Sequence, residues 1–349
     1  MSSKLLKMTD NLNASVQIPN IVFGTSGLGN LYQSQSFESK KEIIKAVIEH
    51  SRGIAFFDTA GKYGAGLALE VLGQSLSELN IDPPKVVISN KLGWFRTELL
   101  SPEPTFEPGV WKDLKYDAIQ KISYQGILEC FEQGNCLLGK YNTEFVSVHD
   151  PDEYLSAAKN TEDYHKRYDD VLEAYRALKE LKAAGRVKAV GIGAKDWKII
   201  EKICADVDLD WVMIANSLTV HSHPNDLVEF LSLLNKKNIP VINSAIFNGG
   251  FLIGSDFYNY RFVDGSKSAD RALLKWREDF FELCKKFHLL PAEVCYNFST
   301  RFPGIKSIAM STSKVEKVAV NIAMASAEVP NEFWEEMERI GLINNKLKV

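Results

Sequence analysis

The chain has 349 residues, of which 45% are hydrophobic and 25% are charged, with a formal net charge of −4 and an isoelectric point near 6.0. This composition is typical of a soluble globular protein with a large core. The mild acidity argues against a nucleic-acid partner, because such proteins carry a basic surface. We also expect neither a signal peptide nor a membrane contact, since no apolar run reaches the length of a membrane span.

The cysteine and histidine patterns argue against a metal site. The five cysteines are an odd number and lack the spacing of metal ligands (Cys130, Cys136, Cys204, Cys284 and Cys295). We therefore expect reduced thiols in a cytoplasmic protein. His221 and His223 form the only close histidine pair, and we interpret them as part of a solvated loop.

Apolar runs alternate with amphipathic segments along the chain after a polar tail or short hairpin at residues 1–19. Strands are expected where β-branched and aromatic residues form short continuous runs, and helices where apolar residues recur with helical spacing. The expected strands are 20–23, 54–58, 85–91, 145–149, 187–193, 210–215, 239–243 and 305–309. The expected helices are 37–50, 67–79, 118–138, 169–184, 197–205, 224–237, 269–287, 291–301, 314–325 and 331–339.

Eight strand–helix units with no break in composition predict one domain over residues 1–349. Near-continuous apolar strands indicate a parallel sheet covered on both faces, and eight such units close best as a (β/α)8 TIM barrel of the α/β class. A doubly wound sheet is the alternative. Against it, no G-x-G-x-x-G motif opens a helix after the first strand.

Two stretches interrupt this alternation. Residues 92–118 are rich in proline and have no clear period, so we expect a long, lid-like loop after the third strand. Its aromatic residues Trp94, Phe95 and Trp111 suit a surface that stacks on a ligand, although Trp111 could equally pin the loop to the barrel. A second irregular stretch is expected at 254–268.

Four polar residues follow consecutive strands, and their chemistry is complementary. Asp58 ends the second strand with Tyr63 just beyond it, Lys91 ends the third and His149 the fourth. A phenol is a poor acid or base at neutral pH, but a nearby ammonium lowers its pKa and a carboxylate keeps the ammonium charged. A histidine can orient a substrate oxygen or relay its proton. Singly, each could be an ordinary cap, strand-end or loop residue; together they predict a catalytic site.

The motifs that carry these residues resemble those of the aldo-keto reductase family. FFDTAGKYGAG, ISNKLG and VSVHDPD are similar to its aspartate–tyrosine, lysine and histidine motifs, and the resemblance runs from about Ile21 to Ala325. It implies an NAD(P)-dependent enzyme for carbonyl and alcohol chemistry, without a metal. It also implies that Tyr63 is the general acid/base, that Lys91 and Asp58 tune it, and that His149 orients the substrate.

The resemblance further implies cofactor contacts around the mouth of the barrel. They are Gly24, Thr25, Asp58, Ala194, Asn216, Ser244, Phe247, Gly249, Ser311, Ser313, Lys317 and Asn321. Two departures stand out. Ala194-Lys195 replaces the Ser-Asn pair that grips the nicotinamide amide, and Ser311 replaces a basic residue of NADP-preferring relatives. Lys317 stands where an arginine is usual, so we favour NAD over NADP. Val320 replaces a glutamate near the adenine.

Three further motifs resemble the branch that contains D-threo-aldose (L-fucose) 1-dehydrogenases and pyridoxal 4-dehydrogenases: GIGAKDW, ANSLTVH and INSAIFNGGFL. This implies oxidation of the anomeric carbon of an aldose such as L-fucose or D-arabinose to a lactone. Trp94, Trp197 and Phe247 could stack on the sugar or pack at the barrel rim, and Asp150 and Asn248 could bind hydroxyls. An NADPH-dependent aldehyde or ketone reductase and a slow, redox-sensing barrel remain as alternatives. The oligomeric state is open.

Overall fold

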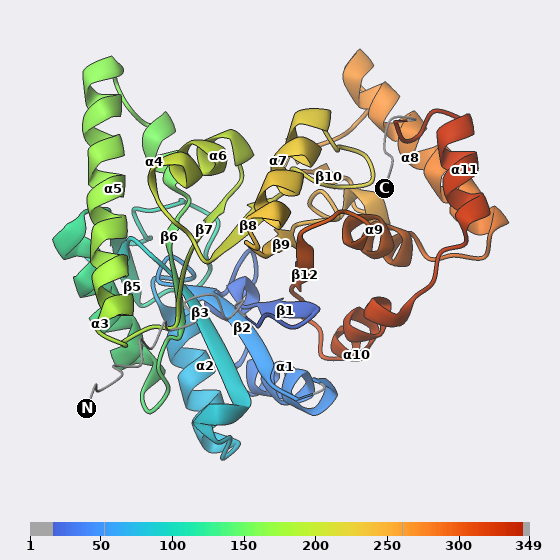
Figure 1. Cartoon of the computed structure of the whole chain (residues 1–349). Coiled ribbons are helices and arrows are strands. Elements are labelled where there is room, and N and C mark those ends of the chain that lie inside the picture. Colours follow the sequence, from blue (N-terminus) through green and yellow to red (C-terminus); the bar gives the residue numbers. More distant parts are fainter. Residues whose placement is uncertain (1–16, 52, 260, 345–349) are drawn as a thin grey trace, which may run out of the picture.

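The computed structural model describes residues 17–51, 53–259 and 261–344. The expected tail or hairpin at 1–19 therefore lies almost wholly outside the described residues. Eight parallel strands close into a barrel in the order β1-β12-β9-β8-β7-β6-β3-β2, with helices packed around it (Figure 1). The strands are β1 (Ile21–Gly24), β2 (Ala55–Ala60), β3 (Val86–Leu92), β6 (Phe145–His149), β7 (Ala189–Ala194), β8 (Trp211–Ala215), β9 (Val241–Ser244) and β12 (Ile305–Met310). The predicted (β/α)8 barrel is confirmed.

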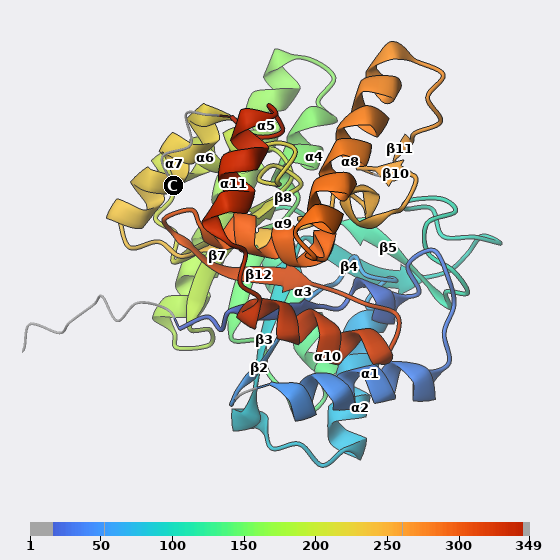
Figure 2. The ribbon, with the colours of Figure 1, turned by 90° about the vertical axis from the view of Figure 1, so that its right-hand side faces the viewer.

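Helices fill the connections between consecutive barrel strands, as a parallel barrel requires. They are α1 (Phe37–His50), α2 (Leu67–Glu78), α3 (Tyr124–Leu138), α4 (Pro151–Ser156), α5 (Thr161–Ala183), α6 (Trp197–Asp206), α7 (Asn225–Lys236), α8 (Ser268–Lys286), α9 (Pro291–Thr300), α10 (Glu316–Ala323) and α11 (Asn331–Arg339). The extra C-terminal helix α11 contacts α8 on the outside of the barrel (Figure 2). No helix in the described ranges is long and apolar enough to cross a membrane.

The interior of the barrel is filled by large side chains from neighbouring strands. Phe145 lies between Phe56, with ring centroids 5.0 Å apart, and Trp211, at 6.3 Å. A Cβ at Gly191 would come within 2.2 Å of the Trp211 indole, so only glycine leaves room for this ring. These packed layers close the barrel to solvent and leave its carboxyl end as the place for a pocket.

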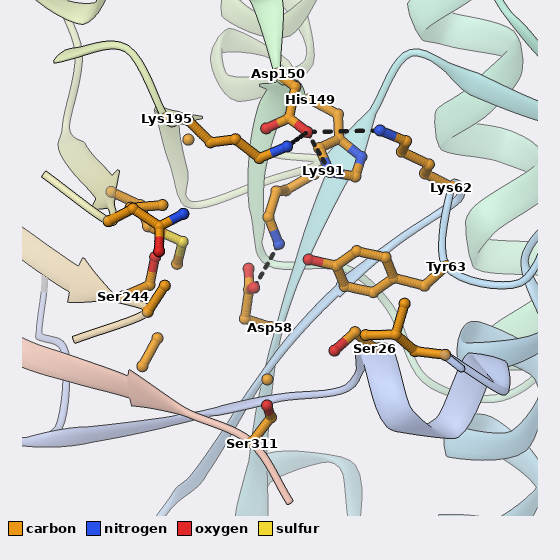
Figure 3. Close-up of a pocket in the computed structure, with 18 of the residues that line it drawn as sticks. Ser26, Asp58, Lys62, Tyr63, Lys91, His149, Asp150, Lys195, Ser244 and Ser311 are labelled. Carbon is orange, nitrogen blue, oxygen red and sulfur yellow. Dashed lines mark hydrogen bonds and ion pairs between the residues drawn. The ribbon is translucent and has the colours of Figure 1, made fainter. Parts of the chain in front are cut away.

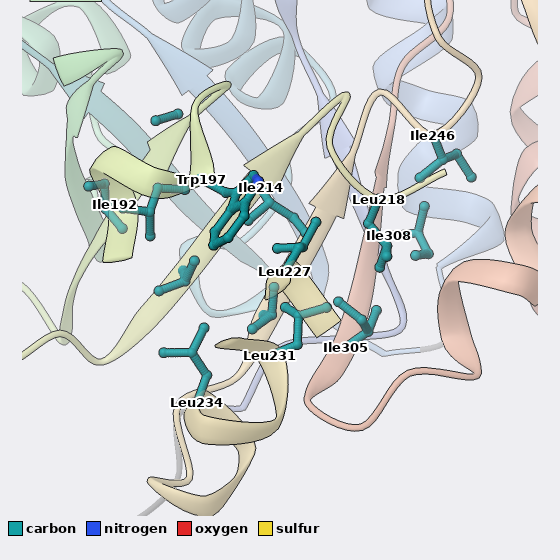
Figure 4. Close-up of a cluster of buried hydrophobic side chains, with 14 of the residues drawn as sticks. Ile192, Trp197, Ile214, Leu218, Leu227, Leu231, Leu234, Ile246, Ile305 and Ile308 are labelled. Carbon is teal, nitrogen blue, oxygen red and sulfur yellow. The ribbon is translucent and has the colours of Figure 1, made fainter. Parts of the chain in front are cut away.

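The outer layer packs helices against the other face of the strands. Trp197, at the start of α6, is 8% exposed and stacks on Phe230 of α7 with ring centroids 6.0 Å apart. Ile214 of β8 and Leu227 of α7 belong to the same buried cluster (Figure 4). Of the two roles considered for Trp197, the structure favours packing over contact with a sugar.

The expected loop at 92–118 is wrong at both of its ends. Trp94–Glu98 forms β4 and Tyr116–Gln120 forms β5, and the two pair antiparallel from Trp94↔Gln120 to Glu98↔Tyr116. The helix expected from Ala118 instead begins at Tyr124, after Ser123 accepts a hydrogen bond from the Gly126 N–H. The hairpin could not be predicted from the proline-rich sequence, because its paired residues lie 18 to 26 positions apart along the chain. Only its tip is irregular.

Three smaller differences concern turns and boundaries. The stretch 254–268 contains a short hairpin of β10 (Phe257–Tyr258) and β11 (Arg261–Phe262). Helix α5 begins two turns earlier than expected, because the Asn160 side chain accepts the Asp163 N–H. Helix α4, which is not among the expected helices, begins two residues after His149 with Pro151 at its first position. In the first two cases, pairing of a short ladder or hydrogen bonding by a polar side chain outweighed the weak apolar pattern.

The position of Trp197 leads to a stability prediction. Trp197→Ala removes a large buried side chain, so the free energy of unfolding should fall by about 3–5 kcal/mol in urea denaturation. The Michaelis constants for dinucleotide and substrate should stay close to the parent values. Unchanged stability together with a weakened substrate interaction would instead make Trp197 a substrate contact.

Candidate active site

A cavity of about 390 Å³ opens at the carboxyl ends of the barrel strands (Figure 3). All four residues of the expected catalytic set line it: Asp58, Tyr63, Lys91 and His149. Residues of the β1, β8, β9 and β12 ends complete one side, and the tip of the β4–β5 hairpin contributes Glu107, Val110 and Trp111. The strands thus bring together four predicted catalytic residues that lie up to 91 positions apart in the chain, from Asp58 to His149.

Lys91 and Asp58 form a buried ion pair at the centre of this cavity. Strands β2 and β3 pair in register, with Ala60 opposite Lys91, so the two side chains reach each other across neighbouring strands. Their side chains are only 6% and 5% exposed. Burial alone would lower the pKa of Lys91, but the charge of Asp58 and the hydrogen bonds that Lys91 makes to Asp58 and Tyr63 outweigh it, so the pKa is raised. Lys91 is therefore a permanent cation.

Tyr63 lies in the turn after β2 with its ring against both Lys91 and His149. The Lys91 ammonium is 4.9 Å from the ring centroid, and the imidazole of His149 meets the phenol ring edge-on at 5.5 Å. Burial is the largest influence on the Tyr63 phenol and raises its pKa above the ordinary value, although Lys91 acts in the opposite direction. The expectation that the ammonium lowers this pKa overall was wrong, because removal of the phenol from water outweighs the attraction. The resting side chain is a protonated phenol.

His149 is neutral at physiological pH. Burial, together with the nearby cations Lys62, Lys91 and Lys195, holds the pKa of its imidazole well below the usual range. Its Nδ1 has no hydrogen-bond partner among the described residues, and its Nε2 lies 3.5 Å from the Asp150 carboxylate. A proton on Nε2 suits this carboxylate and leaves an N–H donor at the cavity.

Five charged side chains surround the outer part of the cavity, and we call them the rim cluster: Lys62, Glu107, Asp150, Glu153 and Lys195. Lys62 Nζ lies 2.8 Å from Glu107 and 3.0 Å from Glu153, and Lys195 pairs with Glu153. Asp150 lies between the two ammonium groups, 3.7 Å from Lys62 and 4.0 Å from Lys195. Burial raises the pKa of Asp150 to about 6 despite these two cations.

Of the rim cluster, only Asp150 is predicted as a site residue from the sequence; the other four members are not. Lys62 precedes Tyr63 within the motif, and Glu153 follows Asp150 by one helical turn, so both follow strand ends that had already been singled out. Lys195 was noted only as a departure. Asp152 fixes it by accepting the N–H groups of Lys195 and Asp196 at 3.1 and 2.9 Å.

Many of the expected cofactor positions lie along the opposite wall. Gly24, Ala194, Asn216, Ser244, Phe247 and Ser311 line the cavity. Thr25 is fully buried behind it and donates its hydroxyl to the Asp58 carbonyl at 3.0 Å. Gly249, Ser313, Lys317 and Asn321 are not among the described residues that line the cavity. They follow the β9 and β12 ends, beyond its edge.

The aromatic residues expected to contact substrate differ in position. Trp111 lines the cavity, 5.9 Å from the Tyr63 ring, and its indole N–H donates to Glu107, so it both faces the pocket and pins the hairpin tip. Trp94 packs under the hairpin against Phe106, and Phe95 faces the ammonium of Lys121. Asn248 is fully buried and donates to Asn259. Four of the expected substrate contacts are therefore not among the described residues that line the cavity: Trp94, Phe95, Trp197 and Asn248.

Comparison with known proteins agrees with this geometry. The profile described as "Aldo/keto reductase family" matches residues 20–341, which is most of the chain. The protein belongs to the aldo/keto reductase family. As a member of that family, it is an NAD(P)-dependent oxidoreductase.

The relatives of this aldo/keto reductase include two dehydrogenases. It is 27% identical to a pyridoxal 4-dehydrogenase of Microbacterium luteolum, over 92% of this chain and 93% of that protein. It is 25% identical to a D-threo-aldose 1-dehydrogenase of a Pseudomonas species, over 95% of this chain and 96% of that protein. Among solved structures, an aldo-keto reductase of Bacillus halodurans superposes with a TM-score of 0.66 at 16% identity, covering 92% of this chain and 91% of that one. The structural likeness supports the barrel fold.

The raised pKa of Asp150 predicts a pH-dependent stability difference. The folded protein keeps a proton on Asp150 up to about pH 6, whereas the unfolded chain loses it near 3.8, so the unfolded state binds fewer protons in between. The contribution of Asp150 to stability therefore falls as pH rises through this window. Asp150→Asn should avoid the loss and raise the free energy of unfolding by about 1–3 kcal/mol above the window.

Urea denaturation of both proteins below and above this window measures the effect. Asp208→Asn is the matched control, because the Asp208 side chain is fully exposed, and it should show no such pH-dependent gain. A gain in Asp150→Asn that does not grow with pH would contradict the assignment.

Proposed function

We propose that this aldo/keto reductase oxidises the anomeric carbon of an aldose, such as L-fucose or D-arabinose, to a lactone, with Tyr63 as the general acid/base. The observation that carries the proposal is the meeting of Tyr63 and His149 at the cavity, with the Lys91–Asp58 pair behind the phenol. The polar rim cluster suits a hydroxylated substrate better than a hydrocarbon one. The name of one relative, a D-threo-aldose 1-dehydrogenase, supports the same class of substrate.

The cavity fits a nicotinamide cofactor. The Oδ1 atom of Asn216 is buried at the cavity wall without a hydrogen-bond partner in the described part of the chain, so it can accept from a carboxamide N–H. Gly24 and Ser311 line the same wall, where a Cβ at Gly24 would meet the Ser311 side chain at 3.4 Å, an ordinary van der Waals contact. When bound, the nicotinamide supplies the hydride acceptor or donor.

The protein residues then hold the substrate and move its proton. In oxidation, the resting phenol of Tyr63 first releases its proton, and the phenolate then accepts the proton of the anomeric hydroxyl; in reduction, the phenol donates its proton to the carbonyl oxygen. Lys91 stabilises the phenolate that forms, and Asp58 holds Lys91 in place. The Nε2–H group of His149 donates a hydrogen bond to the reacting oxygen and keeps its proton. Trp111 supplies an apolar wall.

The proposed cofactor preference is NAD. Ser311 lines the cavity where NADP-preferring relatives carry a basic residue, and Lys317 on α10 is a point charge rather than a bidentate arginine. A 2′-phosphate is best held by paired, charge-assisted hydrogen bonds. For the cell compartment, we propose the cytoplasm, on the basis of five cysteines without the spacing of a disulfide framework.

One observation favours a second candidate, reduction of an aldehyde. Because the pKa of Tyr63 is raised, the resting phenol carries its proton and is ready to donate it to a carbonyl oxygen. The same site would then run in the opposite direction with the reduced dinucleotide. The two candidate reactions use the same residues and differ in the direction of proton transfer.

A substrate panel tests the proposal directly. L-fucose, D-arabinose, L-galactose, pyridoxal and simple aldehydes are supplied with NAD+, NADP+ and their reduced forms, and nicotinamide absorbance is followed. We expect oxidation of at least one aldose, with a higher kcat/KM for NAD+ than for NADP+. Turnover of aldehydes alone, with NADPH, would favour the reductase and exclude aldose oxidation.

The role of Tyr63 predicts the effect of removing one hydroxyl. Tyr63→Phe should lower kcat by about 10²–10⁴-fold, because proton transfer loses its acid/base. Dinucleotide affinity, measured by quenching of intrinsic fluorescence, should be little changed. Tyr116→Phe is the control, since Tyr116 is 41% exposed on the hairpin and should keep parent activity. Turnover by Tyr63→Phe at the parent rate would refute the mechanism.

A further inference from the structure

The carboxylate of Asp150 lies at the cavity without a hydrogen bond from any described residue. Its nearest polar neighbours are nitrogen atoms at ion-pair distance: His149 Nε2 at 3.5 Å, Lys62 Nζ at 3.7 Å and Lys195 Nζ at 4.0 Å. The side chain is only 14% exposed, so little bulk water reaches it. A buried carboxylate normally accepts several hydrogen bonds, and this one has its acceptor capacity open towards the cavity.

The backbone and the neighbouring residues hold this carboxylate in position. Asp150 adopts the left-handed conformation with φ of 44°, directly before Pro151 at the start of α4. A non-glycine residue in this region costs free energy and is kept only where the surroundings fix it. The next acidic residue, Asp152, bonds two backbone N–H groups of the loop after β7, which fixes α4 against that loop.

Other carboxylates hold the ammonium groups of Lys62 and Lys195 out of direct contact with Asp150. Lys62 is held by Glu107 and Glu153, and Lys195 by Glu153, so neither ammonium group closes onto Asp150. An ammonium has three N–H donors. Lys62 uses one for each of its two close partners, which leaves its third donor for a ligand group that also bonds Asp150. The Asp150 carboxylate thus stays 3.7 Å from Lys62 and 4.0 Å from Lys195, beyond hydrogen-bond distance, and all three groups line the cavity.

A hydroxyl group matches this arrangement of one carboxylate acceptor and two flanking ammonium donors. It donates one hydrogen bond and accepts others, so it can donate to the Asp150 carboxylate and accept from an ammonium. Two hydroxyls on neighbouring carbons can share the carboxylate, one on each side. Because Asp150 lies beside His149, which faces the reacting oxygen, these hydroxyls would be those on the two carbons that follow the reacting one, C2 and C3 of an aldose.

The charge of the rim cluster argues against an anionic group in the same place. The cluster contains three carboxylates, Glu107, Asp150 and Glu153, against two ammonium groups, Lys62 and Lys195. Both lysines are already neutralised by close partners, so a substrate carboxylate or phosphate would meet an uncompensated negative charge. The site therefore suits an uncharged polyol.

We propose that Asp150, Lys62 and Lys195 form a polyol clamp that binds two neighbouring hydroxyl groups next to the reacting carbon of the substrate. The clamp rests on the proposed function for its substrate class and deepens it, because it selects sugars by the hydroxyls beyond the reacting carbon. Asp150 accepts from both hydroxyls, while Lys62 and Lys195 each donate to one. The selection disfavours 2-deoxy sugars, simple aldehydes and sugar acids.

Paired sugars test the clamp. L-fucose, D-arabinose and L-galactose are each compared with their 2-deoxy analogue, and D-galacturonate serves as the anionic probe. Equilibrium binding to the enzyme with its dinucleotide is measured by saturation-transfer NMR and calorimetry, and kcat/KM is measured where turnover occurs. For at least one sugar, the parent should prefer the 2-hydroxy form by about tenfold or more, since a buried charged group loses its partner in the deoxy form.

Two variants should abolish this preference. Asp150→Asn and Lys62→Met should weaken binding of the 2-hydroxy sugar by about 10- to 100-fold and leave the deoxy sugar within about threefold of the parent. Lys62→Met keeps an apolar side chain over the Trp94 ring, which the Lys62 ammonium now faces at 5.4 Å. Lys188→Met is the control, because Lys188 forms an equally close pair with Glu144 outside the cavity and should retain the preference. Retained dinucleotide affinity in each variant shows that the pocket has folded.

The possible failures can be told apart. Turnover or binding of sugars with a preference that both variants retain would overturn the clamp and leave the proposed function intact. Preferential binding of D-galacturonate, lost in Lys62→Met, would overturn it in favour of an anion site. Binding of the sugars with the expected preference, but without turnover in either direction, would support the clamp and contradict the proposed reaction. Binding of none of the panel sugars would overturn both.

Discussion

The buried ion pair between Lys91 and Asp58 is the interaction on which the site depends. Two charges taken out of water are stable only if they meet in a fixed geometry, and here parallel pairing of β2 with β3 provides it. The Asp58 backbone carbonyl also accepts both the N–H and the hydroxyl of Thr25, which ties the loop after β1 to the same point. Three strand ends thus meet at one residue. Tyr63 follows Asp58 by five residues, so fixing Asp58 also fixes the position of the Tyr63 side chain.

The rim cluster shows a second electrostatic arrangement with a different purpose. The central pair is closed, with both charges in direct contact, whereas Asp150 is held at a distance from its cations by the competition of Glu107 and Glu153. The closed pair fixes the chemistry of one oxygen. An open arrangement costs the folded state free energy, as the raised pKa of Asp150 indicates, and such costs concentrate where a protein binds its ligand. The Lys91–Asp58 pair therefore stabilises the site, whereas the rim cluster is available to bind the ligand.

Much of the fold and of the central site could be predicted from the sequence, because both depend on local sequence patterns. Continuous apolar runs gave the barrel strands, and polar residues at their ends gave Asp58, Lys91 and His149, all of which line the cavity. The sign of the Tyr63 pKa shift could not be predicted, because it depends on how much water the surrounding chain removes. Trp94 and Trp197 were ambiguous for the same reason, since an aromatic residue near a strand end can face either the pocket or the helices. The ion-pair partners of Lys62 come from two separate segments, the tip of the β4–β5 hairpin and the start of α4, and no local pattern predicts that these segments meet.

The hairpin of β4 and β5 has a two-part construction. Its stem is fixed to the barrel, because Gln133 of α3 exchanges two hydrogen bonds with the backbone of Arg96. Its tip extends over the cavity and docks on the loop after β1, where Tyr32 donates to the Val110 carbonyl and Lys112 to the Asn30 carbonyl. The tip supplies Glu107 and Trp111 to the cavity, yet it contributes nothing to the eight barrel strands. Evolution can therefore exchange this segment between relatives and diversify what the enzyme accepts, while the inherited proton-transfer machinery beneath it stays the same.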